Sequence, residues 1–224
     1  MSANKALMVT IAIILGVAMV YPQVANKKTG ATASDASVDS TQWTLVNRSL
    51  STINEGNREV LSVDSRKGAG LLLHPETQFG DGTIEFDVKG KNVPQKSFVG
   101  LAFHGVSEEM YDAIYFRPFN FNSPDSASHS HAVQYISIPG NGWKTLRDTH
   151  PGEYENSLDS PPDPDSWFHV RVELKYPQVR VYVNRSEHAC LSVTQLSDHR
   201  EGWVGFWVGD DSDGEFAGLK LTPR

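Results

Sequence analysis

The stretch Thr83-Ile-Glu-Phe-Asp-Val-Lys89 alternates apolar and polar side chains at successive positions. In an extended chain the apolar side chains fall on one side and the charged ones on the other. The same alternation appears in His169-Val-Arg-Val-Glu-Leu-Lys175 and in Gln178-Val-Arg-Val-Tyr-Val-Asn184. A period of two over seven residues is typical of antiparallel strands with one buried and one wetter face.

Shorter strand patterns continue through the rest of the body, at residues 58–63, 69–74, 97–104, 111–118, 131–137, 189–193, 202–208 and 215–222. Stretches rich in Gly, Asp, Asn and Pro separate them. No stretch from Trp43 onward sustains a helical period. The sequence therefore predicts an all-β fold, a two-sheet antiparallel β-sandwich or jelly roll.

Two connections, 119–130 and 138–166, are long and lack a strand pattern. Long loops in a compact domain are usually functional or disordered. Their aromatic residues favour a functional rim. The second loop carries polar and aromatic side chains suited to such a rim, namely Trp143, Arg147, His150 and Tyr154.

Composition and charge restrict the class of protein. The 224 residues are 39% hydrophobic and 10% aromatic, enough for a core and against disorder. The net charge is −7, and no basic patch is present to neutralise phosphates, which argues against nucleic acid as a partner. Cys190 is the only cysteine, so no intrachain disulfide can form, and we expect it to be buried and inert.

The N-terminus resembles a targeting segment. Lys5 precedes an apolar run at 6–20, which is typical of a secretory signal and short for a transmembrane helix. We expect residues 1–25 to be a signal peptide or an uncleaved membrane anchor, 26–40 a flexible linker, and 41–224 the folded domain. This organisation predicts a periplasmic or secreted protein that contacts a membrane, if at all, only through an uncleaved N-terminal segment.

Several segments resemble concanavalin A-like lectin/glucanase domains in the same order. They are Phe79-Gly-Asp-Gly-Thr-Ile-Glu-Phe-Asp-Val88, Trp167-Phe-His-Val-Arg-Val172, Val181-Tyr-Val-Asn184, Gly202-Trp-Val-Gly-Phe-Trp207 and Phe216-Ala-Gly-Leu219. Within that superfamily, which also includes laminin G-like domains, the chain is most similar to secreted bacterial 3-keto-disaccharide hydrolase-like domains. The resemblance implies a carbohydrate ligand outside the cytoplasm. These motifs are turns and core positions, so they specify the fold better than the activity.

Alternation gathers one set of candidate ligand-binding residues on a single sheet face, namely Arg117, Tyr115, Trp207, Gln134 and His104. Gly100, Ala102 and Gly205 fall on the same face and leave room above it. Aromatic rings cover the C–H side of a sugar, and planar polar groups bind its hydroxyls. The alternative is that Trp207 and Tyr115 pack under a loop and that Arg117 is structural, tying down loop 119–130.

The carboxylates give weaker signals of catalysis. Family 16 glucanases use Glu-x-Asp-x-x-Glu, and retaining hydrolysis needs two carboxyls about 5–5.5 Å apart. Here Glu85 and Asp87 supply the first half, but Gly90 occupies the third position. The same spacing occurs on any polar strand face, so ordinary retaining hydrolysis is not supported.

Metal binding is the remaining possibility. His104, His129 and His131 could meet Asp112 if loop 119–130 folds over strand 97–104, although no close-spaced metal motif supports this. Asp211 and Asp213 lie in an acidic turn that contains Gly214, which is compatible with a structural Ca²⁺ but equally with an ordinary hairpin.

The leading prediction is a secreted β-sandwich domain that binds a glycan or disaccharide on one sheet face. A glycan-cleaving enzyme of the 3-keto-disaccharide hydrolase or lyase kind is the first rival. A structural or adhesive envelope domain without a small ligand is the second.

Overall fold

The computed structural model describes residues 43–74 and 77–224. The predicted signal or anchor at 1–25 and the predicted linker at 26–40 lie outside the described residues. Within the described part, no helix is long and apolar enough to cross a membrane.

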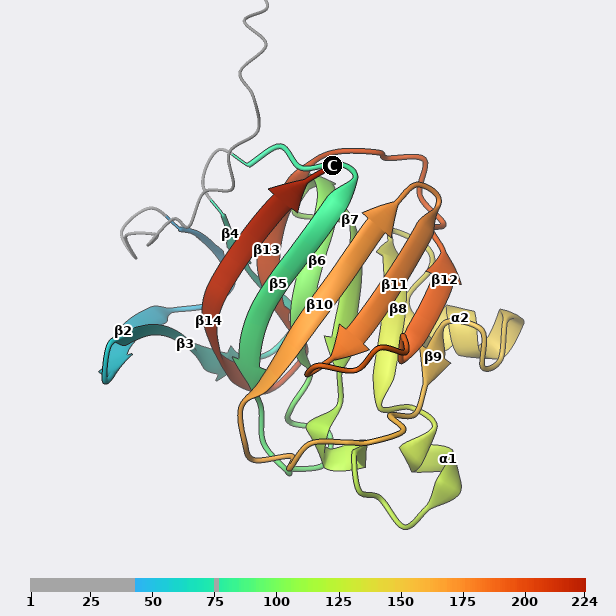
Figure 1. Ribbon diagram of the computed structural model, residues 1–224, viewed down its shortest axis with the longest axis horizontal. Helices are drawn as coiled ribbons and strands as arrows, with labels where there is room; N and C mark the ends of the chain where they lie inside the picture. The colour runs from blue at the N-terminus through green and yellow to red at the C-terminus, as the bar shows by residue number, and fades with distance from the viewer. Residues whose placement is uncertain (1–42, 75–76) are drawn as a thin grey trace, which may run out of the picture. The chain divides into compact units, whose positions relative to one another are not determined.

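Two antiparallel sheets of seven strands each form the domain (Figure 1). Sheet A has the order β1-β4-β13-β6-β7-β8-β9 and sheet B the order β12-β11-β10-β5-β14-β3-β2. The strands of sheet A are β1 (Thr44–Val46), β4 (Gly70–Leu73), β13 (Trp203–Val208), β6 (Val99–Ser107), β7 (Met110–Phe116), β8 (Val133–Ile138) and β9 (Glu155–Asn156). Those of sheet B are β12 (Leu191–Thr194), β11 (Gln178–Val183), β10 (Phe168–Lys175), β5 (Gly82–Lys89), β14 (Ser212–Pro223), β3 (Arg58–Arg66) and β2 (Leu50–Glu55). The predicted all-β sandwich is confirmed.

The core lies between the two sheets and is built around stacked phenylalanines. Phe206 of β13 stacks on Phe216 of β14 with ring centroids 4.4 Å apart, and its ring lies 5.6 Å from Phe86 of β5. All three side chains are buried, so the alternation seen in the sequence of β5 does aim its apolar residues at the opposite sheet.

The two sheets differ in how their outer faces are buried. In β5 and β10, buried and partly exposed residues alternate along the strand. In β6, β7 and β8 nearly every residue is buried, so the central strands of sheet A are covered on both faces. The outer face of sheet A is therefore the one that other parts of the chain pack against.

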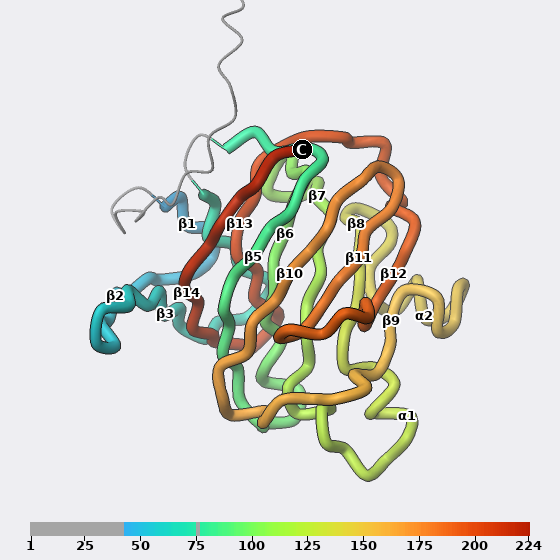
Figure 2. Tube along the Cα trace, in the orientation of Figure 1, coloured from blue at the N-terminus to red at the C-terminus, as the bar shows by residue number. Residues whose placement is uncertain are grey.

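Among the described residues, three strands and three short helical elements were not predicted. The strands are β1, β2 and β9; the helical elements are η2 (Pro118–Asn120), α1 (Ser126–His129) and α2 (Trp143–Thr149). The prediction of no helix was wrong for α2, which has seven residues and a single buried one, Leu146. A helix this short presents too few apolar residues for its period to be read. Beyond α2 and β9 the chain crosses beneath one end of the sandwich to reach β10 (Figure 2).

Candidate functional site

Strand register brings three of the predicted ligand-binding residues into one row across sheet A. Trp207 pairs with Gly100, Gly100 with Tyr115, and Tyr115 with Gln134. The row continues from Gln134 to Glu155 on β9. Directly paired residues in an antiparallel sheet point to the same face. The neighbouring residues in β13 and β7 belong to the core, so this row lies on the outer face.

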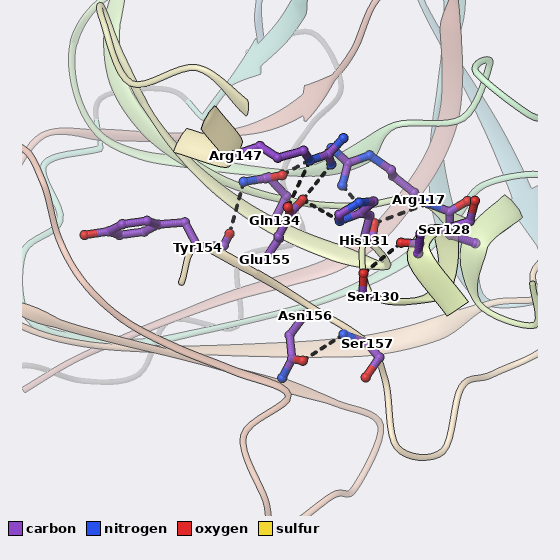
Figure 3. A network of polar contacts seen from close by, with 12 residues as sticks. Arg117, Ser128, Ser130, His131, Gln134, Arg147, Tyr154, Glu155, Asn156 and Ser157 are labelled. Carbon is purple, nitrogen blue, oxygen red and sulfur yellow. Dashed lines mark hydrogen bonds and ion pairs between the residues drawn. The ribbon is translucent and has the colours of Figure 1, made fainter. Parts of the chain in front are cut away.

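Arg117 follows β7 and binds to this row (Figure 3). Its Nη1 donates to the His131 carbonyl at 2.8 Å, and its Nη2 donates to Tyr115 Oη at 2.7 Å and to Gln134 Oε1 at 3.2 Å. Arg117 is 5% exposed, and burial lowers the pKa of its guanidinium. The guanidinium therefore joins loop 117–131 to the sheet through three neutral acceptors.

The other members of the row are also buried, and they contact one another or accept and donate hydrogen bonds within the protein. Gln134 Nε2 donates to the carbonyls of Tyr135 and Tyr154 at 3.0 and 3.1 Å. Trp207 lies 4.8 Å from the Tyr115 ring, and burial raises the pKa of Tyr115 to about 12, so the phenol is neutral. Trp207 is 7% exposed. The row forms a packed layer, as in the alternative left open by the sequence, and not an open ligand surface.

A second set of polar residues lies at the exposed edge of this layer. Glu155 is buried and accepts hydrogen bonds from Arg147 Nε at 2.9 Å and from Arg147 Nη2 at 2.6 Å. His131 Nδ1 lies 2.9 Å from Glu155 Oε2. The Arg147 guanidinium lies 5.1 Å from the ring of Trp143 on α2, and Trp143 is 48% exposed. We call Trp143, Arg147, His131 and Glu155 the rim.

The rim connects the buried layer to solvent. The side chains of His131 and Arg147 are 24% and 31% exposed, whereas that of Glu155 is 3% exposed. Burial is the largest influence on the pKa of His131 and lowers it below 6.5, although Glu155 opposes the shift. Burial thus favours the neutral imidazole, whose Nδ1 lies beside the Glu155 carboxylate.

Sequence reasoning found this rim only in part. The long loop 138–166 was expected to be functional, and it does supply Trp143 and Arg147. His131 was considered for a metal site. Glu155 was missed, because one acidic residue in a loop carries no periodic signal that it will be buried beside a sheet.

The structure does not place His104 on the face where the sequence predicts it. Its ring lies inside the domain, 1% exposed, with Nδ1 3.2 Å from Gln195 Oε1 and Nε2 3.5 Å from the Gly80 carbonyl. A register shift between Phe103 and Ser107 interrupts β6, and His104 has a φ of 49°. This β-bulge ends the alternation on which the prediction rested.

The predicted grouping of histidines with Asp112 does not form. Asp112 is buried, accepts a hydrogen bond from Tyr135 Oη at 2.7 Å, and is also bound by the Ser197 hydroxyl. His131 instead lies at the rim beside Glu155. Within residues 43–74 and 77–224, no group of three or more His, Cys, Asp or Glu side chains could hold a metal ion.

The acidic turn after β13 is occupied by lysines. Lys67 Nζ lies 2.6 Å from Asp211 Oδ2, and Lys91 pairs with Asp213. Each carboxylate proposed for Ca²⁺ thus has a cationic partner of its own. The acidic turn is therefore a hairpin that ion pairs hold to Lys67 and Lys91.

Glu85 and Asp87 lie on the outer face of sheet B, on the other side of the sandwich from the rim. Asp87 is 2.8 Å from His169 Nδ1 and 3.2 Å from Arg58, and Glu85 lies 3.6 Å from His169 Nε2. Arg58 and Lys220 lie beside these carboxylates on a solvent-facing surface, and neither carboxylate can act together with Glu155.

Cys190 lies just before β12 at the edge of the core. Its Sγ–H donates to the Val181 carbonyl at 3.3 Å, and burial raises the pKa of the thiol to about 12. Such a thiol is a poor nucleophile at neutral pH.

Comparison with known proteins supports the fold and leaves the activity open. No protein-family description matches the chain. No curated protein matches its sequence. Solved structures do match, so the likeness lies in the architecture.

One similar structure is the carbohydrate-binding module CBM66 from Bacillus subtilis, with a TM-score of 0.57 and 17% identity over 81% of this chain and 95% of that one. A Bacillus subtilis protein of unknown function with a galectin-like fold has a TM-score of 0.54 and 11% identity, over 82% and 91%. The exoplasmic/lumenal domain of VIP36, bound to Ca²⁺ and Man3GlcNAc, has a TM-score of 0.50 and 14% identity, over 84% and 86%. The chain thus has the concanavalin A-like β-sandwich fold.

Proposed function

We propose that the protein binds carbohydrate and that the ligand contacts the rim. The observation that carries this proposal is Trp143, whose indole is 48% exposed beside the partly exposed His131 and Arg147. Among the described residues, the other exposed large hydrophobic side chains are aliphatic. An exposed indole next to fixed polar groups suits the C–H face and the hydroxyls of a sugar.

The buried layer supports the rim from below. Arg117, Tyr115 and Gln134 are hydrogen-bonded to one another and to the loops that carry His131 and Tyr154. Side chains held in this way keep a binding surface in one geometry, so less ordering is needed when a ligand binds. In this proposal these residues position the rim and do not touch the sugar.

The structural neighbours support the same proposal. CBM66 is named as a carbohydrate-binding module, and the VIP36 domain holds Man3GlcNAc with Ca²⁺. At these identities the likeness extends to the fold, and the choice of site rests on the geometry of the rim.

The test is a glycan array with the full-length chain in mild detergent, with and without Ca²⁺, followed by titration of each hit. We expect Trp143→Ala to weaken binding at least about tenfold, equivalent to about 1.4 kcal/mol. Trp167→Ala is the matched control, because Trp167 stacks on Arg58 away from the rim. Loss of binding in the control alone, with both variants folded, would place the ligand elsewhere.

The rival enzyme function is tested with the same hits. Each bound glycan, and an oxidised 3-keto-disaccharide beside its unoxidised parent, is incubated with the protein and assayed for released product. Product released by the wild type and not by His131→Asn would indicate cleavage and overturn a function of binding alone. Binding without product is the expected result.

A further inference from the structure

We infer that the glycan bound at the rim is an acidic one, and that its carboxylate is held by Arg147. This inference rests on the proposed function and narrows it to a class of ligand. It follows from the balance of charge between the rim and the layer beneath it.

Arg117 is a buried cation without an anionic partner in contact. Its three acceptors are a carbonyl, a phenol and an amide, and all of them are neutral. A buried charge is costly unless an opposite charge lies close by. The nearest carboxylate of the cluster is Glu155, which lies one row position beyond Gln134.

Glu155 is already committed to other partners. Both of its oxygens accept hydrogen bonds from Arg147, and His131 approaches the second oxygen. One carboxylate therefore faces two guanidinium groups and a neutral imidazole, which leaves about one positive charge in excess.

Two neighbouring carboxylates, Asp148 and Asp125, contribute little to this balance. On α2, Lys144 Nζ lies 2.5 Å from Asp148 Oδ2, so that pair cancels. Asp125 at the start of α1 is exposed and accepts hydrogen bonds from Ser128, and solvent screens its effect.

The excess charge can be reached from solvent. Arg147 binds Glu155 through Nε and Nη2. Its third nitrogen, Nη1, makes no hydrogen bond among the described residues. A sugar carboxylate can accept from Nη1 while the sugar ring lies against Trp143. The partly exposed His131 ring lies beside Arg147 and Glu155 (Figure 3), where a sugar hydroxyl can hydrogen-bond to it.

The overall charge makes this inference specific. The chain carries a net charge of −7, so nonspecific adsorption of a polyanion is disfavoured. Tight binding of an acidic polysaccharide would then report a local site.

The experiment compares polyuronates with their methyl esters, which keep the same backbone and lose the charge. Polygalacturonate and polymannuronate, free and esterified, are titrated into the full-length chain by calorimetry, with a neutral mannan alongside. We expect at least one free polyuronate to bind at least tenfold more tightly than its ester. Trp143→Ala and Arg147→Lys should each remove most of that binding, while Arg171→Lys on sheet B should leave it unchanged.

The outcomes separate the two proposals. Equal or tighter binding of the esters or of the mannan, lost in Trp143→Ala, would overturn the acidic class and keep carbohydrate binding at the rim. Polyuronate binding that survives both rim variants would overturn the site. No binding of any glycan by the folded protein would overturn the proposed function and this inference together.

Discussion

The two outer faces of the sandwich handle charge in opposite ways. On sheet B, Glu85, Asp87 and His169 are partly exposed and lie among cations and anions that pair locally. On sheet A, Arg117 and Glu155 are almost fully buried, and the hydrogen bonds of Arg117 go to neutral groups. The first face is a solvated surface. The second face holds charge where water cannot screen it, so substituting one of its charged side chains should change stability more.

The largest expected difference concerns one carboxylate on each face. Glu155→Ala would remove the carboxylate that balances Arg147 and the buried Arg117. Because Arg147 is partly exposed, we expect a loss of stability below the roughly 3–5 kcal/mol typical of breaking a fully buried ion pair. Glu85→Ala removes a partly exposed carboxylate 3.6 Å from His169 and 3.8 Å from Lys220, and pairs that solvent screens contribute about 0–1 kcal/mol. Urea unfolding of both variants measures the difference.

Similar losses in these two variants would break the comparison between the faces. A Glu155→Gln variant isolates the effect of the charge, because the amide keeps the shape of the side chain and removes only the charge. We expect the free energy of unfolding of Glu155→Gln to lie between those of the wild type and Glu155→Ala.

Two arginines provide the next test. Lysine at position 117 cannot reach three acceptors at once, so Arg117→Lys should lower the free energy of unfolding by about 1.5–3 kcal/mol. Arg171→Lys is the control, because Arg171 lies on sheet B, pairs with Glu173 and stacks on Tyr182 with 30% of its side chain exposed. A melting temperature that falls in the control and not in Arg117→Lys would contradict the structural role of Arg117.

The smallest expected effect is on pH dependence. Burial lowers the pKa of both His104 and His131 below 6.5 in the folded protein. As the pH falls through 6.5 the unfolded chain therefore binds protons first, and stability declines by at most about 1.4 kcal/mol per pH unit for each histidine. His104→Asn should flatten this decline between pH 7 and pH 5, because asparagine tolerates the positive φ and does not titrate. Unfolding curves at several pH values measure the slope, and an unchanged slope would rule out His104.

The fold could be predicted because its signal is local. In β5, alternate residues face the core and solvent, and that pattern is visible within seven letters. Strands such as β2 were missed because most of their residues are exposed, so no buried face imposes a period. The helix α2 was missed for the same reason.

The site could be predicted only as far as register could be inferred. Tyr115 and Gln134 were expected on one face, and β7 and β8 do pair them. Whether that face was open could not be read, because the cover comes from a loop whose path depends on tertiary contacts. The expected position of His104 differs from the structure because a β-bulge interrupts β6. Such a bulge depends on backbone geometry and could not be read from the residue types.

The place of β14 in sheet B has a consequence for how the chain folds. This strand pairs with β5 on one side and with β3 on the other, so the β2–β3 hairpin joins the sheet only through it. During synthesis, β3 can join sheet B only after residues 212–223 are made, whereas β5 can already pair with β10. Contacts this distant in sequence make folding slow and leave strand edges unpaired meanwhile. The edge of β5 that pairs with β14, and the β2–β3 hairpin, therefore stay unpaired with the rest of sheet B until residues 212–223 are made.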